Sequence, residues 1–345
     1  MYADGAVCSL GCRPLGARFG WPVAPFHAEH PLRSGLNELR PGSLHVGLDV
    51  QVRDGTRVYA VQPGLAHVLA ARGPDARVQV GNYVYWHIAP TVRSGEYVVP
   101  FKTVLGRVMA GYGHFAFSEL GFSGQYVNPL RPGGRVLDPL VDQDRPVIAT
   151  PKVAADGEVV VGAYAPQSFV RHTTYITPVL APSSLAYRLY SARGTPLTPL
   201  EWALRGTHLE PFALRRLIYA PGTHEPGFAC FAKRRICVPR WNYRIAGGFA
   251  PSLPRTLGPG HYRLTIYAWD FDDHATALDT TVTLTARGWR PLGHFPPAVL
   301  DGSWSGAERY RYGYEYGYGY RYRYGYQHSL GSGLGAASAP LYRRR

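Results

Sequence analysis

Two side chains of the metal-ligand type, His45 and Asp49, stand four positions apart in the segment spanning residues 44–49. A glycine between them lets the chain bend, so one imidazole and one carboxylate can reach a common zinc ion. Further along, His114 and position 116 lie two residues apart in an aromatic stretch, which predicts a strand with both side chains on one face. A histidine at position 116 would supply a third ligand, but the residue there is Ala116, whose methyl group binds no metal.

This pattern resembles that of the lysostaphin or LytM-type zinc metallopeptidases, which cut peptide cross-links of bacterial peptidoglycan. Their signature is H-x-x-x-D followed by H-x-H on a strand. His45 and Asp49 match the first two zinc ligands of that family. His114 matches the first histidine of H-x-H, and His87, which follows Tyr-Trp, matches another; both are catalytic in the family. The resemblance covers residues 20 to 120, about a third of the chain.

The resemblance implies an all-β first domain at residues 21–140, a β-sheet peptidase fold of the duplicated-hybrid-motif type, after a poorly ordered leader at residues 1–20. It also implies Zn²⁺ as the cofactor and peptidoglycan peptides as the partner. In the family, zinc polarises the scissile carbonyl and activates water, with the residues matched by His87 and His114 as general base or transition-state stabiliser.

Ala116 is the departure from the family pattern, and it bears on activity. A catalytic zinc usually takes three protein ligands and one open position for water. His45 and Asp49 alone therefore predict weak zinc binding and impaired catalysis. The polar side chains that are candidate substitute ligands are His27, His30 and Glu119, and Ser118, which shares a strand face with position 116.

Two functions remain open at this point. The first is a zinc-dependent peptidoglycan endopeptidase in which a substitute ligand restores the site. The second is a non-catalytic descendant that binds wall peptides or regulates another hydrolase, with His45, Asp49, His87 and His114 persisting as a polar network. Zinc content of the purified protein separates the two functions.

The second half of the chain differs from the first in its sequence pattern. Short runs with alternating apolar residues, separated by Gly and Pro turns, predict about seven strands over residues 145–286. This spacing is typical of an immunoglobulin-like β-sandwich. Four polar residues in one turn of this region, Asp270, Asp272, Asp273 and His274, have side chains that suit calcium, but such clusters more often bond their own backbone in hairpin turns.

The C-terminal segment, residues 287–345, is of low complexity. Tyrosine occupies every even position from Tyr310 to Tyr326, with Arg, Gly or Glu between, and the segment has no aliphatic core. This composition predicts disorder with a tendency to associate as β-strands. Aromatic residues alternating with arginine also suit stacking on bases or sugars, but we expect disorder without specific binding.

Charge and cysteine content indicate the environment. The net charge of +14 favours polyanions, and without a nucleic-acid motif the first candidates are anionic wall polymers, with no specific nucleic acid expected. No apolar run is long enough to span a membrane. The start of the chain has no recognisable signal peptide, yet the resemblance implies an extracellular or cell-envelope protein, in which Cys230 and Cys237 are candidates for a disulfide.

Overall fold

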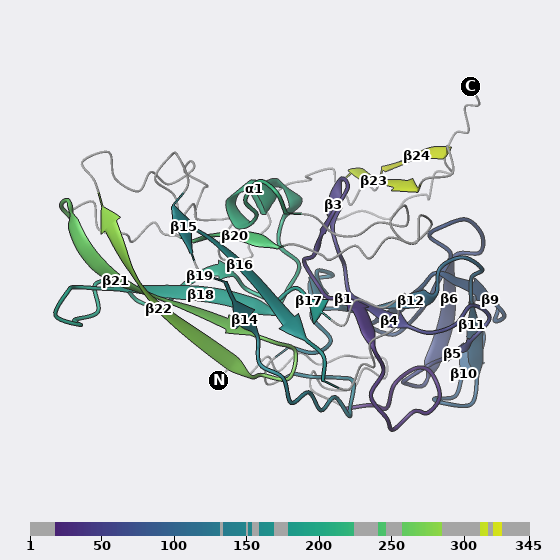
Figure 1. Ribbon diagram of the computed structural model, residues 1–345. Helices are drawn as coiled ribbons and strands as arrows, with labels where there is room; N and C mark the ends of the chain where they lie inside the picture. The colour runs from purple at the N-terminus through teal and green to yellow at the C-terminus, as the bar shows by residue number, and fades with distance from the viewer. Residues whose placement is uncertain are drawn as a thin grey trace. The chain divides into compact units, whose positions relative to one another are not determined.

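The structure is a computed structural model, and it describes residues 18–131, 134–149, 151–153, 159–168, 179–223, 241–245, 257–284, 311–316 and 320–325. The chain divides into two compact units, one of residues 1–40 with 44–293 and one of residues 41–43 with 294–345. The described residues are predominantly in β-strands, which confirms the all-β prediction (Figure 1). The two finer fold types and the predicted domain boundaries stay predictions.

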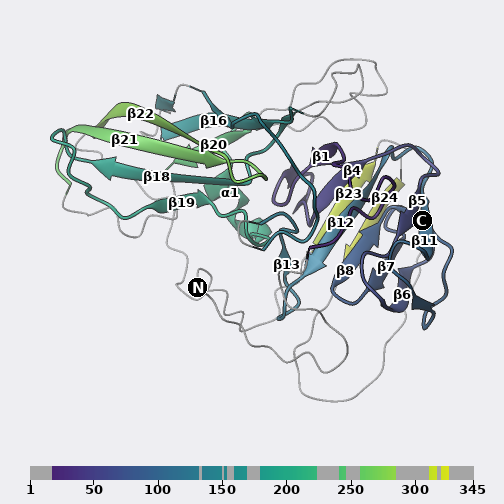
Figure 2. The ribbon, with the colours of Figure 1, turned by 90° about the horizontal axis from the view of Figure 1, so that it is seen from below.

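The first half of the larger unit contains an antiparallel sheet whose middle strands carry the predicted site. Its strands run in the order β1-β4-β12-β8-β7-β6-β10, with β13 paired to β12, and Figure 2 shows β4, β12 and β8 side by side. The bounds are β1 (Leu32–Ser34), β4 (Leu48–Gln51), β12 (His114–Leu120), β8 (Tyr83–Trp86), β7 (Arg77–Val80), β6 (Gly64–Ala70), β10 (Tyr97–Val98) and β13 (Tyr126–Val127). Two short strands, β2 (Leu39–Arg40) and β3 (Ser43–Leu44), lie between β1 and β4 in the sequence.

A three-stranded sheet packs its apolar residues into the same core. It consists of β5 (Arg57–Tyr59), β11 (Val104–Val108) and β9 (Ile88–Pro90), in the order β5-β11-β9. The shared core includes Val50 and Phe115 from the large sheet and Val58, Ile88 and Leu105 from the small one, all fully buried. Because side chains alternate along a strand, burying Val50 and Phe115 turns their neighbours Asp49 and His114 to the opposite face of the sheet.

The second half of the larger unit forms two further antiparallel sheets, seen at the left of Figures 1 and 2. One is centred on β16 (Val159–Pro166), which pairs with β14 (Val147–Ile148), β15 (Lys152–Val153), β17 (Val179–Leu180) and β20 (Asn242–Ile245). The other runs β19-β18-β21-β22, with bounds β19 (Glu201–Leu204), β18 (Ser184–Tyr190), β21 (Gly260–Trp269) and β22 (Ala275–Leu284). A 3₁₀ turn, η1 (Phe212–Leu214), leads into the one short helix described, α1 (Arg215–Ile218).

Along the strands of this half, buried and exposed side chains alternate, as expected for sheets with one exposed face. In β16, Val159, Val161 and Ala163 are buried, and the residues between them are partly exposed. This pattern follows from one apolar face and one polar face. Two neighbouring sheets with such faces are compatible with a sandwich, while the immunoglobulin-like topology stays a prediction.

Hydrogen bonds join the two halves within the larger unit. The side-chain amide of Gln167 pairs with the backbone of Leu32, with one bond of 2.9 Å to its oxygen and one of 2.8 Å from its nitrogen. The Glu210 backbone N–H donates to Asn37 Oδ1 at 2.7 Å, and Asn37 Nδ2 donates to the His208 carbonyl at 2.9 Å. These bonds hold the segment after β1, which contributes to the candidate site, against residues from the second half.

We expect this junction to weaken as the pH rises, because of Glu210. Burial raises the pKa of the Glu210 carboxyl to about 7, although Arg205 opposes the shift. A carboxyl with a raised folded-state pKa stabilises the fold below its unfolded value of about 4.3 and loses that contribution as the pH rises to about 7. Relative to the unmodified protein, Glu210→Gln should therefore gain up to about 3 kcal/mol between pH 5 and pH 8.

Urea unfolding of both proteins at several pH values measures this difference. Glu96→Gln, at an exposed position, is the matched control and should show no such trend. A stability difference between Glu210→Gln and the unmodified protein that stays constant with pH would contradict the expectation.

In the smaller unit the structure describes one hairpin, in which β23 (Arg311–Tyr316) pairs antiparallel with β24 (Tyr320–Gly325). This pairing agrees with the predicted tendency of the tyrosine repeat to associate as strands, while disorder of the whole tail stays a prediction. Cys8, Cys12, Cys230 and Cys237 lie outside the described residues, so the disulfide also stays a prediction. In the described part of the chain no helix has the length and apolarity needed to span a membrane.

Candidate functional site

The residues of the predicted signature gather on the face of the large sheet that points away from the core. In the antiparallel register, Ala116 of β12 lies opposite Asp49 of β4 and also opposite Trp86 of β8. His114 precedes Ala116 by two residues and shares its face. Its Nε2 lies 3.6 Å from Asp49 Oδ1. Cross-strand pairing of β4 and β12 thus joins two parts of the signature that are far apart in sequence.

His45 reaches Asp49 from the segment before β4. Its backbone N–H donates to the Glu38 carbonyl at 2.8 Å, and its Nδ1 lies 2.8 Å from the Gly35 carbonyl oxygen. A carbonyl only accepts, so Nδ1 carries a proton. The other ring nitrogen, Nε2, lies 2.9 Å from Asp49 Oδ1. Gly47 permits this approach, because a Cβ there would lie 2.3 Å from the Phe117 carbonyl oxygen.

His87 joins the group through an uncommon backbone conformation. It lies between β8 and β9 with φ of 61°, in the left-handed region that residues other than glycine seldom adopt. Its Nδ1 lies 2.8 Å from the Pro74 carbonyl oxygen, which assigns the ring proton to Nδ1. The ring packs edge-on against His114 at 5.2 Å and stacks on Tyr112 at 4.7 Å. All four signature residues are therefore brought together.

Burial sets the charge state of this cluster. It lowers the pKa of His114 to about 3, although Asp49 opposes the shift, and it also lowers the pKa of His87. Both rings are therefore neutral at pH 7. Burial acts to raise the pKa of Asp49, but His45 and Arg40 outweigh it and hold that pKa well below its usual range. Asp49 is therefore an ionised carboxylate beside two neutral imidazoles, those of His87 and His114, which each keep one unprotonated nitrogen.

A cation that no zinc signature includes lies beside Asp49. Arg40 Nη2 is 3.3 Å from Asp49 Oδ2 and donates to Ser34 Oγ at 2.6 Å, and Arg40 Nη1 is 3.7 Å from Glu38 Oε2. The Glu38 side chain is fully buried, and its Oε1 accepts from the Gly35 and Ala181 backbone N–H groups. Burial raises the pKa of the Glu38 carboxyl, although Arg40 opposes the shift. Arg40 therefore supplies, from the protein itself, a positive charge beside the ionised Asp49.

Position 116 is enclosed by aromatic and basic side chains. The Trp86 indole N–H donates to Ser118 Oγ at 3.0 Å, and the Arg77 guanidinium lies 4.4 Å from the Trp86 ring centroid. Arg77 is opposite Trp86 on β7. A row across four strands thus consists of Asp49, Ala116, Trp86 and Arg77. In this row the small side chain of Ala116 stands between the carboxylate and the indole.

These residues do not fit a catalytic zinc. His45 Nε2 and Asp49 Oδ1 lie 2.9 Å apart and contact each other directly. Two ligand atoms of one tetrahedral zinc ion lie farther apart than this. The third family position holds a methyl group, and the second oxygen of Asp49 already faces Arg40. Among the residues that the structure describes, no group of three or more His, Cys, Asp or Glu is arranged to hold a metal ion.

The proposed substitute ligands make other contacts. His30 Nε2 lies 3.0 Å from the Pro25 carbonyl, and the His27 ring lies against Phe101. Glu119 accepts two hydrogen bonds from Arg131, of 2.6 and 3.1 Å. Only Ser118, on the face predicted for it, contacts the row that contains Ala116, and it does so through Trp86.

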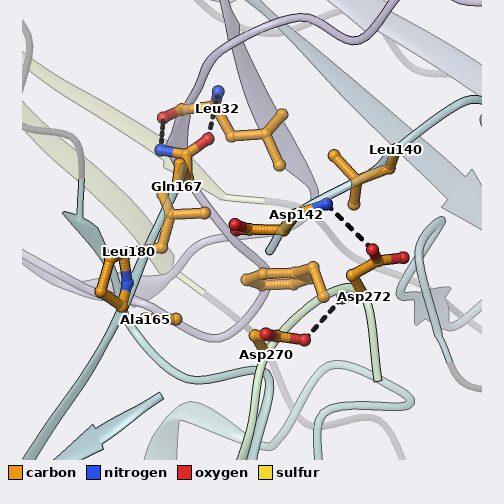
Figure 3. Close-up of a pocket in the computed structure, with 10 residues that line it drawn as sticks. Leu32, Leu140, Asp142, Ala165, Gln167, Leu180, Asp270 and Asp272 are labelled. Carbon is orange, nitrogen blue, oxygen red and sulfur yellow. Dashed lines mark hydrogen bonds between the residues drawn. The ribbon is translucent and has the colours of Figure 1, made fainter. Parts of the chain in front are cut away.

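A small pocket elsewhere in the same unit is lined by two residues of the predicted calcium alternative, Asp270 and Asp272, together with Asp142 (Figure 3). Asp270 Oδ1 accepts the backbone N–H groups of Asp272 and His274, at 2.8 and 2.9 Å. The Asp142 N–H donates to Asp272 Oδ2, which also appears in Figure 3. Asp270 therefore bonds the backbone of its own turn, as the turn interpretation predicts.

Neither a scan against protein-family models nor a search of curated proteins found a match to this chain. We define the polar cluster as the six residues that meet on this sheet face, Glu38, Arg40, His45, Asp49, His87 and His114. Sequence reasoning missed Glu38 and Arg40. No motif marks them, because a Glu-x-Arg pair is common on protein surfaces.

Proposed function

We propose that this is a peptidoglycan-directed protein of the cell envelope, related by descent to lysostaphin or LytM-type zinc endopeptidases, that binds wall peptides without cutting them. The observation that carries the proposal is the convergence of His45, Asp49, His87 and His114 on one sheet face, with Ala116 opposite Asp49. Hydrolysis in that family needs an activated water, and two protein ligands are too few to hold the metal that would activate it.

The cluster retains groups that suit a peptide ligand. The Tyr112 carbonyl, 2.7 Å from His114 Nδ1, and the Pro74 carbonyl, 2.8 Å from His87 Nδ1, assign the ring protons to Nδ1. Nε2 is therefore the nitrogen of each neutral ring that can accept from a peptide N–H group. Arg33, whose Nη1 lies 3.0 Å from His114 Nδ1, is a half-buried cation beside them. Wall peptides carry free carboxylates, and a guanidinium binds carboxylates through two parallel hydrogen bonds. Arg33, His87 and His114 are therefore the residues that we expect to contact the ligand.

Calorimetric titration with a soluble muropeptide tests this proposal. The unmodified protein should bind it and release no fragments, and Arg33→Met should weaken binding by at least about tenfold, because it removes a charged hydrogen-bond donor. Arg57→Met is the matched control, since Arg57 is an exposed arginine on β5 of the other sheet. Equal affinity of the Arg33 and Arg57 variants, or no binding by the unmodified protein, would contradict the proposal.

A further inference from the structure

The sheet β19-β18-β21-β22 has an aromatic face on the side opposite its buried residues. Leu264, Ile266 and Ala268 of β21 are fully buried, so the alternate residues of that strand, among them Tyr267 and Trp269, lie on the other face. The register places Trp202 of β19 and Tyr267 of β21 on either side of Ala186 of β18. The small side chain of Ala186 leaves room for the larger rings to meet above it.

The rings on this face contact one another. The Trp202 and Trp269 centroids are 5.5 Å apart with planes inclined by 38°, and those of Tyr267 and Trp269 are 5.9 Å apart at 24°. The hydroxyl groups of Tyr267 and Tyr190 share a hydrogen bond. All four rings are half-buried, so each keeps part of its surface in contact with solvent. They form one aromatic strip across three strands.

Arginine side chains lie beside the rings of this strip. The Arg205 guanidinium lies 5.4 Å from the Trp202 ring centroid, and that of Arg263 lies 4.4 Å from the Tyr190 centroid. Arg188 donates to the Tyr190 oxygen. In the described part of the chain none of these three guanidinium groups forms an ion pair with a carboxylate. Their positive charges are available to an anionic ligand.

We propose that this face binds an anionic glycan, a polymer of sugar rings that bear carboxylate or phosphate groups. The aromatic–arginine face consists of Trp202, Trp269, Tyr267 and Tyr190 with Arg188, Arg205 and Arg263. Its rings offer apolar surfaces to the faces of sugar rings, and its guanidinium groups suit the acidic substituents. The inference goes beyond the proposed function, because it uses no residue of the polar cluster and names a second ligand.

Two features of the face favour a glycan over a single-stranded nucleic acid. Asp279 is exposed opposite Thr265 on the same face, where the Thr265 hydroxyl donates to it at 2.5 Å. A carboxylate accepts from the free hydroxyl groups of a sugar ring, which an internal nucleotide of single-stranded DNA does not have. The ring centroids are 5.5 and 5.9 Å apart, which leaves no room for a base between two rings. A base stacked between two rings needs them about 7 Å apart, at roughly 3.4 Å per stacked layer.

The test is a set of titrations of the full chain, in which tryptophan fluorescence and calorimetry measure binding. The probes are an alginate octasaccharide, which has sugar rings and carboxylates, inorganic polyphosphate, which has charge without rings, and an oligothymidylate. Alginate should bind tightest. Trp269→Ala should weaken alginate binding by about tenfold or more and leave polyphosphate binding unchanged, because only the sugar stacks on the ring.

A second pair of variants keeps the test independent of folding. Arg205→Gln with Arg263→Gln should lower the affinity for alginate by at least about tenfold, whereas Arg57→Gln with Arg107→Gln removes two exposed arginines from the first half and should not. Equal losses in the two double variants, unchanged affinity after removal of Trp269, or tighter binding of the oligothymidylate would each overturn the proposal. Arg33→Met should leave alginate binding intact, so failure of this inference and failure of the peptide-binding proposal are distinguishable.

Discussion

Ala116→His combined with Arg40→Met is expected to convert the polar cluster into a zinc site, whereas either substitution alone should do little. The histidine supplies the third ligand next to His45 and Asp49, and the methionine removes the cation that lies 3.3 Å from the second Asp49 oxygen. Two like unit charges about 4 Å apart repel by about 4 kcal/mol at an effective dielectric constant of about 20. We therefore expect the double variant, which lacks the Arg40 charge, to bind zinc at least about 100-fold more tightly than Ala116→His.

Competition with a chromogenic chelator measures the affinities, and cobalt absorption reports tetrahedral coordination. Thermal unfolding gives a second measure, since Arg40→Met leaves Glu38 and Asp49 buried without their cation. Zinc should raise the unfolding midpoint of the double variant because a ligand that binds only the folded state stabilises it. Ala116→His with Arg57→Met is the matched control. If Ala116→His alone binds zinc as tightly as the double variant, Arg40 does not oppose the metal.

Arg131→Met is expected to cause the largest loss of stability, about 3–5 kcal/mol of unfolding free energy. The Glu119 side chain is 1% exposed and accepts both of its hydrogen bonds of 2.6 and 3.1 Å from this one guanidinium. Removing the arginine leaves a buried carboxylate without its partner. Urea unfolding measures the effect. The double variant Glu119→Leu with Arg131→Met should recover most of the loss, since replacing both partners of a buried pair by apolar groups is often neutral.

A loss below about 1 kcal/mol, the value typical of exposed pairs, would show that Glu119 is not held by this pair. The expected loss assigns Glu119 to the stability of the sheet.

The arrangement of the signature residues follows from strand periodicity, which the sequence displays. The alternation in residues 114–118 predicts one polar face with His114, position 116 and Ser118, and the structure places Ser118 in contact with Trp86 on that face. Glu119 has the opposite parity and pairs with Arg131. The predominance of strands can also be predicted from the sequence, because Gly and Pro turns separate short runs in which apolar and polar residues alternate.

Other parts of the site depend on contacts that spacing does not reveal. The left-handed backbone conformation of His87 cannot be predicted from the residue type alone, because a histidine keeps this conformation only where the surrounding structure holds it. Arg40 lies near Asp49 because of the path that the chain takes after β1. That path depends on long-range hydrogen bonds, such as those of Asn37 with residues 208 and 210.

Metal analysis of the unmodified protein after loading with zinc, together with a cleavage assay on cross-linked muropeptides, decides whether this chain is a peptide-binding protein or an enzyme. We expect much less than one zinc per chain, binding of the muropeptide, and no cleavage products with or without a chelator. One tightly bound zinc per chain, with turnover that a chelator abolishes, would contradict this expectation.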